Sequence, residues 1–182
     1  MKHVMLDLET WGVQPFSVIT MIGAVHFDPN SDKLMDSFEV AVDPISSQKA
    51  GLRIDADTVA WWMDPERDAP RKTWFEMLKF ELPIALDGFE QWLDTFCPDP
   101  EERVIWGNGS DFDNALLRQA YRVANREAPW EFRKDRCFRT LKGLSPVDLK
   151  PSRMEAAHTA LADATFQAQW AQNIVRKLGI TI

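Results

Sequence analysis

The order of strand-like and helix-like segments in this sequence predicts an α/β protein with a mixed central sheet flanked by helices. Three consecutive strand-like segments, at residues 3–8, 17–27 and 34–42, are joined by short links and predict an antiparallel meander. Helix-like segments then alternate with a further strand, which is typical of a mixed sheet covered by helices. We find no repeat and no linker long enough to divide the chain, so residues 1–182 are expected to form one domain.

Capping residues and prolines predict the elements that follow the meander. Asp55 or Asp57 is expected to cap a short helix that Pro65 stops. A weaker helix over residues 66–75 is expected to be interrupted at Pro70, because proline removes a hydrogen bond from a helix interior.

The remaining predicted elements are, in chain order, a helix over residues 84–96, a strand over 103–106, and helices over 112–125 and 160–178. Pro83 suits the first position of a helix, and Gly179 suits the residue after one. Residues 44–51 are expected to be irregular, and residues 129–145 carry no clear pattern.

Composition restricts the class of function. The chain has 21 Lys and Arg against 28 Asp and Glu, a net charge of −7. This balance excludes a protein that holds duplex nucleic acid by bulk positive charge, although bound divalent cations can reverse the sign of an acidic site locally. Cys97 and Cys137 match no metal-binding spacing and are expected to be reduced thiols of a cytosolic protein. No secretory signal and no segment long enough to cross a membrane is expected.

Two acids close the first predicted strand. Asp7 and Glu9 are separated by one residue, so they project from the same face of the strand, about 6 to 7 Å apart. Two neighbouring carboxylates repel each other unless a cation or a basic group lies between them. Taken alone, this D-x-E triplet is more typical of a solvated strand end than of a site.

A second acidic segment, N-G-S-D-F-D, begins at Asn108 and follows the fourth predicted strand. Its glycine permits a tight turn, and Asp113 falls in the first turn of the next helix, where negative charge is favourable. An ordinary helix cap, with Ser110 or Asp111 as the capping residue, is the alternative interpretation.

The third motif joins His158 and Asp163 at the start of the last helix. On an ideal helix their side chains would point about 140° apart. They converge only if His158 lies in the preceding loop and Asp163 about one turn into the helix. Residues 151–157 permit such a loop, but a single histidine near a helix start is more often a surface residue than a catalytic one.

Taken together and in this order, the three motifs resemble those of the DEDD exonucleases, which are 3′–5′ exonucleases with a ribonuclease-H-like fold. The histidine in the third motif is typical of their DEDDh, or DnaQ-like, subgroup. The resemblance spans residues 4–173 and extends to Thr10 and to the M-I-G-A sequence of residues 21–24. The Trp61–Trp62 pair is similar to a feature of a phage and bacterial branch. The resemblance implies a ribonuclease-H-like fold and a cytoplasmic location in a bacterial or phage-infected cell.

The resemblance also implies the roles of the acids. Asp7, Glu9, Asp113 and Asp163 would hold two divalent cations, Mg²⁺ or Mn²⁺, and His158 would be the general base. Hard cations prefer carboxylate oxygens, and two of them can activate a water and stabilise a leaving oxygen. Asp111, two residues before Asp113, is the alternative ligand in the second motif.

Residues beside the acids are expected to contact the substrate, namely Thr10, Trp11, Asn108 and Phe112. Trp11 is a candidate for stacking on a terminal base, with packing at the rim of the core as the alternative. Two basic groups are candidates either for phosphate contacts or for solvated surface. The first is Arg118, Arg122 and Arg126, and the second is Arg133, Lys134, Arg136, Arg139 and Lys142.

The expected function is a metal-dependent 3′–5′ exonuclease that releases nucleoside 5′-monophosphates from single-stranded 3′ ends, with DNA as the expected substrate. An exoribonuclease with the same site is the first alternative. The second is a nucleic-acid-binding protein with a relic site, which is disfavoured because an unneeded cluster of carboxylates carries an electrostatic cost. A homodimer is compatible with the sequence, which carries no other indication of oligomeric state.

Overall fold

A six-stranded mixed sheet forms the centre of the protein, whose computed structural model describes residues 1–152 and 159–182. The strand order is β4-β3-β2-β1-β5-β6. The strands are β1 (Lys2–Thr10), β2 (Ile19–Phe27), β3 (Leu34–Val42), β4 (Lys79–Phe80), β5 (Arg103–Gly107) and β6 (Asp135–Cys137). The first three strands form the predicted antiparallel meander, while β5 runs parallel to β1 and β6 parallel to β5. The predicted fold class is therefore confirmed.

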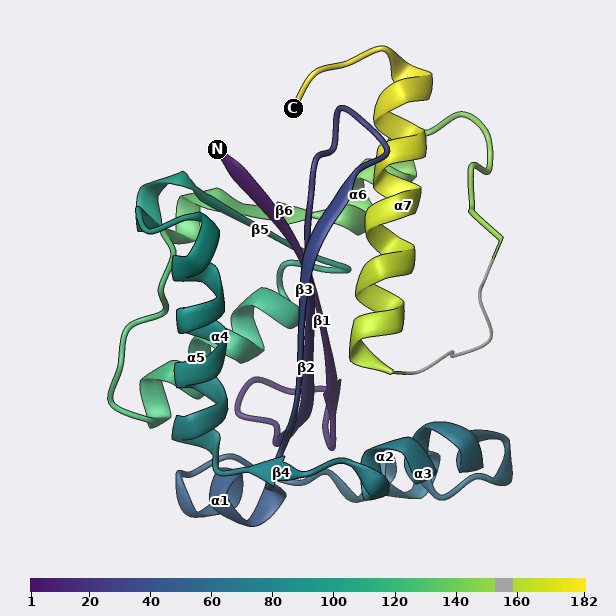
Figure 1. The fold of residues 1–182 in the computed structure, drawn as a ribbon. Helices are drawn as coiled ribbons and strands as arrows, with labels where there is room; N and C mark the ends of the chain where they lie inside the picture. The colour runs from purple at the N-terminus through teal and green to yellow at the C-terminus, as the bar shows by residue number, and fades with distance from the viewer. Residues whose placement is uncertain (153–158) are drawn as a thin grey trace.

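Helices cover both faces of this sheet (Figure 1). The long helices α4 (Leu82–Phe96) and α5 (Asp113–Val123) lie on one face, and α6 (Phe138–Leu144) and α7 (Ala160–Leu178) lie on the other. Three short helices gather at one end of the sheet, namely α1 (Pro44–Lys49), α2 (Ala56–Trp62) and α3 (Asp68–Glu76). Single 3₁₀ turns occur at Pro65–Arg67, Pro100–Glu102 and Phe132–Lys134.

The alternation of β1 determines which side chains face each helical layer. Val4, Leu6 and Leu8 belong to the core beneath α4 and α5, whereas Met5 belongs to the core beneath α6 and α7. Asp7 and Glu9 continue the row that begins at Met5, since every second side chain lies on the same face. Both acids therefore face α7.

Three expectations about the elements need correction. Residues 44–51 are not irregular, because the Asp43 carboxylate caps the backbone N–H groups of Ile45 and Ser46 and starts α1. Pro70 does not interrupt its helix. It is the third residue of α3, where a proline removes no intrahelical hydrogen bond. The strands β4 and β6 were not predicted, because two or three residues are too few to establish a period.

The last helix forms over the predicted residues and ends at Gly179, whose φ of 63° suits a glycine C-cap. Its first turn lies directly against β2. A Cβ on Gly23 would overlap the backbone carbonyl carbon of Ala160 and the amide of Leu161. Only glycine at this point of β2 allows the helix to approach so closely.

Candidate metal centre and nucleic-acid site

Three carboxylates from two elements meet where α7 approaches the sheet. Asp7 and Glu9 come from β1, and Asp163 comes from the first turn of α7. One carboxylate oxygen from each of the three lies within 4.8 Å of the others. The side chains are partly buried, so solvent does not fully screen their mutual repulsion.

Gly23 is the local reason for this convergence. It is the residue of β2 that pairs with Asp7, and its missing side chain admits the start of α7. The backbone N–H of Leu161 also donates a hydrogen bond to Glu39 on β3, at 3.3 Å. The first turn of α7 is thus fixed to β2 and β3, and it places Asp163 beside the acids of β1.

Asp113 is the fourth acid of the group, and two backbone amides hold its carboxylate. Leu8 N donates to Oδ1 at 3.3 Å, and Asn108 N donates to Oδ2 at 2.9 Å. The side chain is only 3% exposed. These bonds connect the start of α5 to β1 and to the turn after β5. Asp111, the alternative candidate in the second motif, is an exposed residue of that turn.

Burial raises the pKa values of Asp7, Glu9 and Asp113, and repulsion between carboxylates adds to this effect at Asp7 and Glu9. The pKa of Asp7 lies well above its usual range because of burial and then the charges of Asp113, Glu9 and Asp163. Burial, followed by the charges of Asp163 and Asp113, raises the pKa of Glu9 to about 8. Burial also raises the pKa of Asp113 to about 7, against the opposing effect of its backbone hydrogen bonds.

The donor set suits a hard divalent cation. Every candidate ligand atom in the cluster is a carboxylate oxygen, the donor that Mg²⁺ and Mn²⁺ prefer. A cation between these groups would offset the repulsion that raises the pKa values of Asp7 and Glu9. The residues present therefore fit a metal centre.

Gln167 contacts this acid cluster, although it was not predicted from the sequence. Its side-chain Nε2 donates a hydrogen bond to Oδ1 of Asp7 at 2.7 Å, and the residue is only 6% exposed. It lies one helical turn after Asp163, on the same face of α7. A polar residue four positions after a candidate ligand was the signal that could have identified it.

The four predicted substrate contacts lie in three different hollows. Thr10 and Phe112 line a groove of about 470 Å³ with Glu9 and with both tryptophans of α2, Trp61 and Trp62.

Asn108 lines a second hollow together with Asp7 and Asp163. Trp11 lies instead beside a small pocket of about 30 Å³, where its ring meets the edge of Trp74 at 5.3 Å between centroids. That pocket is too small for a nucleobase, so packing describes Trp11 better than stacking on substrate does.

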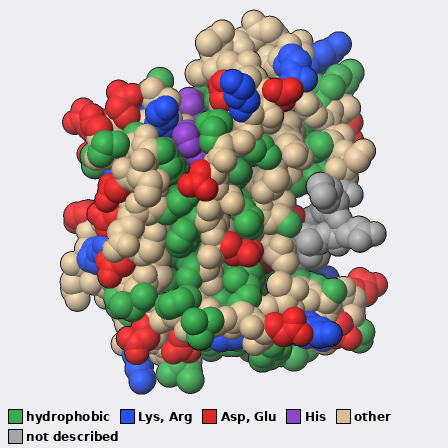
Figure 2. Space-filling model, in the orientation of Figure 1, with side chains coloured by type: hydrophobic (Ala, Val, Ile, Leu, Met, Phe, Trp, Pro, Cys, Tyr) green, Lys and Arg blue, Asp and Glu red, His purple; other side chains and the backbone are tan. Residues whose placement is uncertain are grey.

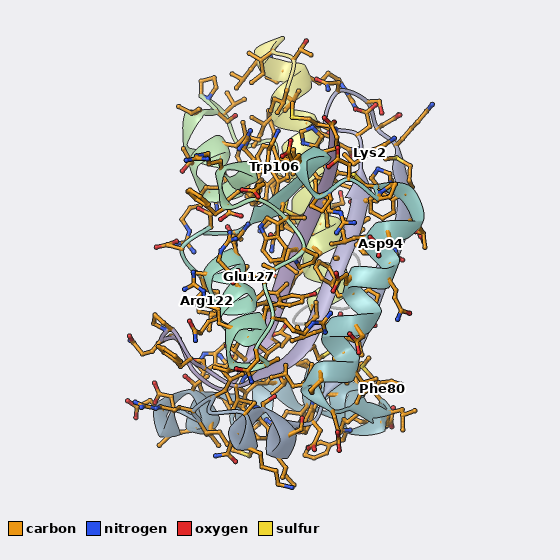
Figure 3. The ribbon with its side chains drawn as sticks, turned by 90° about the vertical axis from the view of Figure 1, so that its left-hand side faces the viewer. Lys2, Phe80, Asp94, Trp106, Arg122 and Glu127 are labelled. Carbon is orange, nitrogen blue, oxygen red and sulfur yellow. The ribbon has the colours of Figure 1, made fainter. Side chains whose placement is uncertain are left out.

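The first basic group lies away from the acids. Arg118 forms an ion pair with Asp135, and Arg126 pairs with Asp87 and Glu90. Figure 3 shows Arg122 on α5, on the face of the sheet opposite α7. In the second basic group, Arg139 donates to the backbone oxygen of Asn108, and Lys142 lines the hollow beside Asp7.

Two further expectations concern the rest of the chain. His158, the predicted general base, lies outside the described residues.

In the described ranges, no helix combines the length and apolar character needed to span a bilayer.

Comparison with known proteins identifies a family and a fold. The family model described as the 3′–5′ exoribonuclease Rv2179c-like domain matches residues 2–175. No curated protein matches the chain in sequence.

Among solved structures, the cell-death related nuclease 4 is 17% identical, with a TM-score of 0.65, and the match covers 97% of this chain and 64% of that one. The chain thus spans less than two thirds of that nuclease. The nuclease domain of 3′hExo, a DEDDh family member bound to rAMP, is 12% identical, with a TM-score of 0.66 and coverage of 97% and 92%. The zinc-bound complex of E. coli ExoI with single-stranded DNA is 13% identical, with a TM-score of 0.63 and coverage of 98% and 41%. These structures share the fold of this protein.

Proposed function

The chain belongs to the Rv2179c-like 3′–5′ exoribonuclease domain family, and from this premise we propose that it is a metal-dependent enzyme that trims single-stranded RNA from its 3′ end. The products would be nucleoside 5′-monophosphates. The family description supports RNA over DNA, which was the substrate expected from the sequence. DNA is retained as the competing substrate in the test below.

The acids and Gln167 would form the metal centre. Asp7, Glu9, Asp113 and Asp163 would hold two divalent cations, Mg²⁺ or Mn²⁺. When bound, such cations supply an activated water and stabilise the leaving oxygen of a phosphodiester. Gln167 would orient the carboxylate of Asp7 through its hydrogen bond, and the two backbone amides would fix Asp113. The observation that carries this proposal is the convergence of Asp7, Glu9 and Asp163 within 4.8 Å.

The groove beyond Glu9 suits the 3′-terminal nucleoside. The rings of Trp61, Trp62 and Phe112 offer surfaces for a base, and Asp55 and Asp57 lie at the same groove. Carboxylates can accept hydrogen bonds from sugar hydroxyls but repel phosphate. The terminal nucleoside is the one unit of the strand with no phosphate on its 3′ side, so it fits an acidic groove.

His158 would accept the proton of the attacking water, a role that rests on the resemblance of the third motif. His158→Ala should lower kcat by about 10²–10⁴, the usual effect of one proton-transfer group. Metal affinity should be unchanged, because all four carboxylates remain. The rise of wild-type activity through the titration of the histidine should disappear in the variant. A variant that loses metal binding together with kcat would contradict this role.

Matched oligonucleotides test the substrate. Single-stranded RNA and DNA of one sequence, each labelled at the 5′ end, are incubated with Mg²⁺ or Mn²⁺ and resolved on one gel. RNA should shorten in single-nucleotide steps from the 3′ end, and faster than DNA. Faster trimming of DNA would overturn the RNA assignment. Binding of both strands without cleavage, by a protein that binds no Mn²⁺ in calorimetry, would indicate a relic site.

A further inference from the structure

A second hollow opens on the other side of the acids from the groove. It has a volume of about 280 Å³ and lies between α6, Lys150 and α7. Asp7 and Asp163 line one side of it, and Lys142 and Lys150 line another. The groove starts at Glu9 and this hollow at Asp7, so the acid cluster lies between the two.

The two lysines make this hollow different in charge from the groove. Lys142 Nζ lies 5.2 Å from the centre of the Trp170 ring, and Lys150 Nζ lies 5.9 Å from that of Phe166. Neither lysine belongs to any of the ion pairs formed within residues 1–152 and 159–182. The two ammonium groups therefore lie close to aromatic rings and form no ion pair with a carboxylate of the described residues.

Two buried amide oxygens of residues that line this hollow are without hydrogen-bond partners. They are Oε1 of Gln167 and Oδ1 of Asn108, and neither finds a donor among the described residues. Gln167 is only 6% exposed, and an unsatisfied buried acceptor is unfavourable. The hollow thus presents ammonium groups for an anion, beside two residues that each hold an unsatisfied buried acceptor.

We propose that this hollow binds the nucleotide on the 5′ side of the scissile phosphodiester, with Lys142 and Lys150 holding its 5′-phosphate. This inference rests on the proposed function. Every internal nucleotide of a strand carries a phosphate on both sides. A strand that crosses the acids from the groove would place those phosphates beyond Asp7. The lysines provide the positive charge there.

Short substrates isolate the proposed contact. A dinucleotide with a 5′-hydroxyl carries only the scissile phosphate, whereas the same dinucleotide with a 5′-phosphate adds the group that the lysines would hold. The wild-type protein should prefer the phosphorylated form in kcat/KM. Lys142→Gln/Lys150→Gln should reduce that preference by about tenfold or more, which corresponds to about 1.4 kcal/mol or more. Hydrolysis of the unphosphorylated dinucleotide should fall by a much smaller factor than hydrolysis of the phosphorylated one.

The control variant is Lys33→Gln/Lys177→Gln, which makes the same change in net charge at exposed positions that do not line the hollow. It should keep the wild-type preference. The inference is overturned if the Lys142→Gln/Lys150→Gln variant keeps the preference, or if that variant loses activity equally on both dinucleotides.

A binding measurement separates this inference from the proposed function. Affinity for a fluorescent single-stranded oligonucleotide is measured against salt in the Asp7→Asn background, in which no turnover is expected. Removing both lysines should weaken binding and reduce the slope of log K against log[salt] by about 1.4, that is, about 0.7 for each phosphate contact with a single strand. An unchanged slope contradicts the subsite. A reduced slope in a protein whose wild type cleaves nothing would retain the subsite and refute the exonuclease proposal.

Discussion

Gln167 donates a hydrogen bond from its side-chain Nε2 to Oδ1 of Asp7, at 2.7 Å, across the interface between α7 and β1. The bond opposes the burial and repulsion that raise the pKa of Asp7, because it stabilises the charged carboxylate. It also fixes the orientation of one candidate ligand from the helix that provides another, Asp163.

Replacing Gln167 by methionine should therefore weaken metal binding while leaving the fold intact. Methionine has a similar volume and no donor, so the Asp7 carboxylate loses its orienting bond. We expect the affinity for Mn²⁺ to fall by about 10- to 100-fold, the usual effect of losing a partner of a metal ligand. Calorimetric titration measures the affinity. Gln169→Met, at a half-buried position of the same helix, is the control. Equal affinities for Gln167→Met and wild type would show that the bond does not organise the site.

The metal-free protein should lose stability as the pH rises. The folded-state pKa values of about 8 for Glu9 and about 7 for Asp113 lie above those of an unfolded chain, so the native state binds more protons than the unfolded state. The free energy of unfolding should therefore fall as the pH rises from about 4 to about 8, the range between the unfolded and folded pKa values of the two groups.

Urea unfolding in EDTA at a series of pH values measures this loss. Saturating Mn²⁺ should remove most of it, because a cation favours the ionised carboxylates. Glu9→Gln should reduce the loss, whereas Glu76→Gln, at an exposed position, should not. A metal-free protein with the same stability at pH 5 and pH 8 would contradict a cluster of buried, repelling acids.

Asp113 and Asp111 should differ sharply on substitution. Asp113→Ala removes a buried carboxylate held by two backbone amides, so it should abolish hydrolysis. Asp111→Ala changes an exposed residue and should retain at least a tenth of the wild-type rate. Initial rates on a labelled oligonucleotide compare the two variants, and the opposite ranking would transfer the ligand role to Asp111.

Gly23→Ala should move α7 away from β1. The added Cβ would overlap the backbone of Ala160, and backbone cannot rotate aside as a flexible side chain can. We expect a loss of about 1 to 3 kcal/mol in stability, as in other overpacked sites, and weaker metal binding because Asp163 shifts. Gly88→Ala on α4 is the matched control, since its Cβ would meet Phe38 only at an ordinary 3.5 Å. Unfolding and Mn²⁺ titration of both variants provide the comparison, in which equal effects would refute the close-packing account.

The sequence predicted the placement of those candidate acids whose positions depend on local geometry. The alternation of a strand was enough to place Asp7 and Glu9 on one face, and the position of Asp163 followed from a helix whose ends were clear. Gln167 and Lys150 were not predicted from the sequence, and Lys142 was predicted only as one member of a group of five basic residues. Their roles depend on how α6 and α7 lie against the sheet, which no local pattern specifies. The same limit applies to Trp11, whose packing against Trp74 on α3 depends on a contact distant in sequence.

We propose above that this acid cluster supports hydrolysis from the 3′ end with a divalent cation. The sharpest test is to identify the first product that is released from a 3′-labelled RNA. Single-stranded RNA with a label in its 3′-terminal nucleotide is mixed with EDTA-treated protein, and Mn²⁺ is then added. We expect no release of the label before Mn²⁺ is added. After the addition, the label should be released as a nucleoside 5′-monophosphate. The Asp163→Asn variant should release no label. Release in EDTA, release within an internal fragment or as a nucleoside 3′-monophosphate, or no release after Mn²⁺ would contradict the proposal.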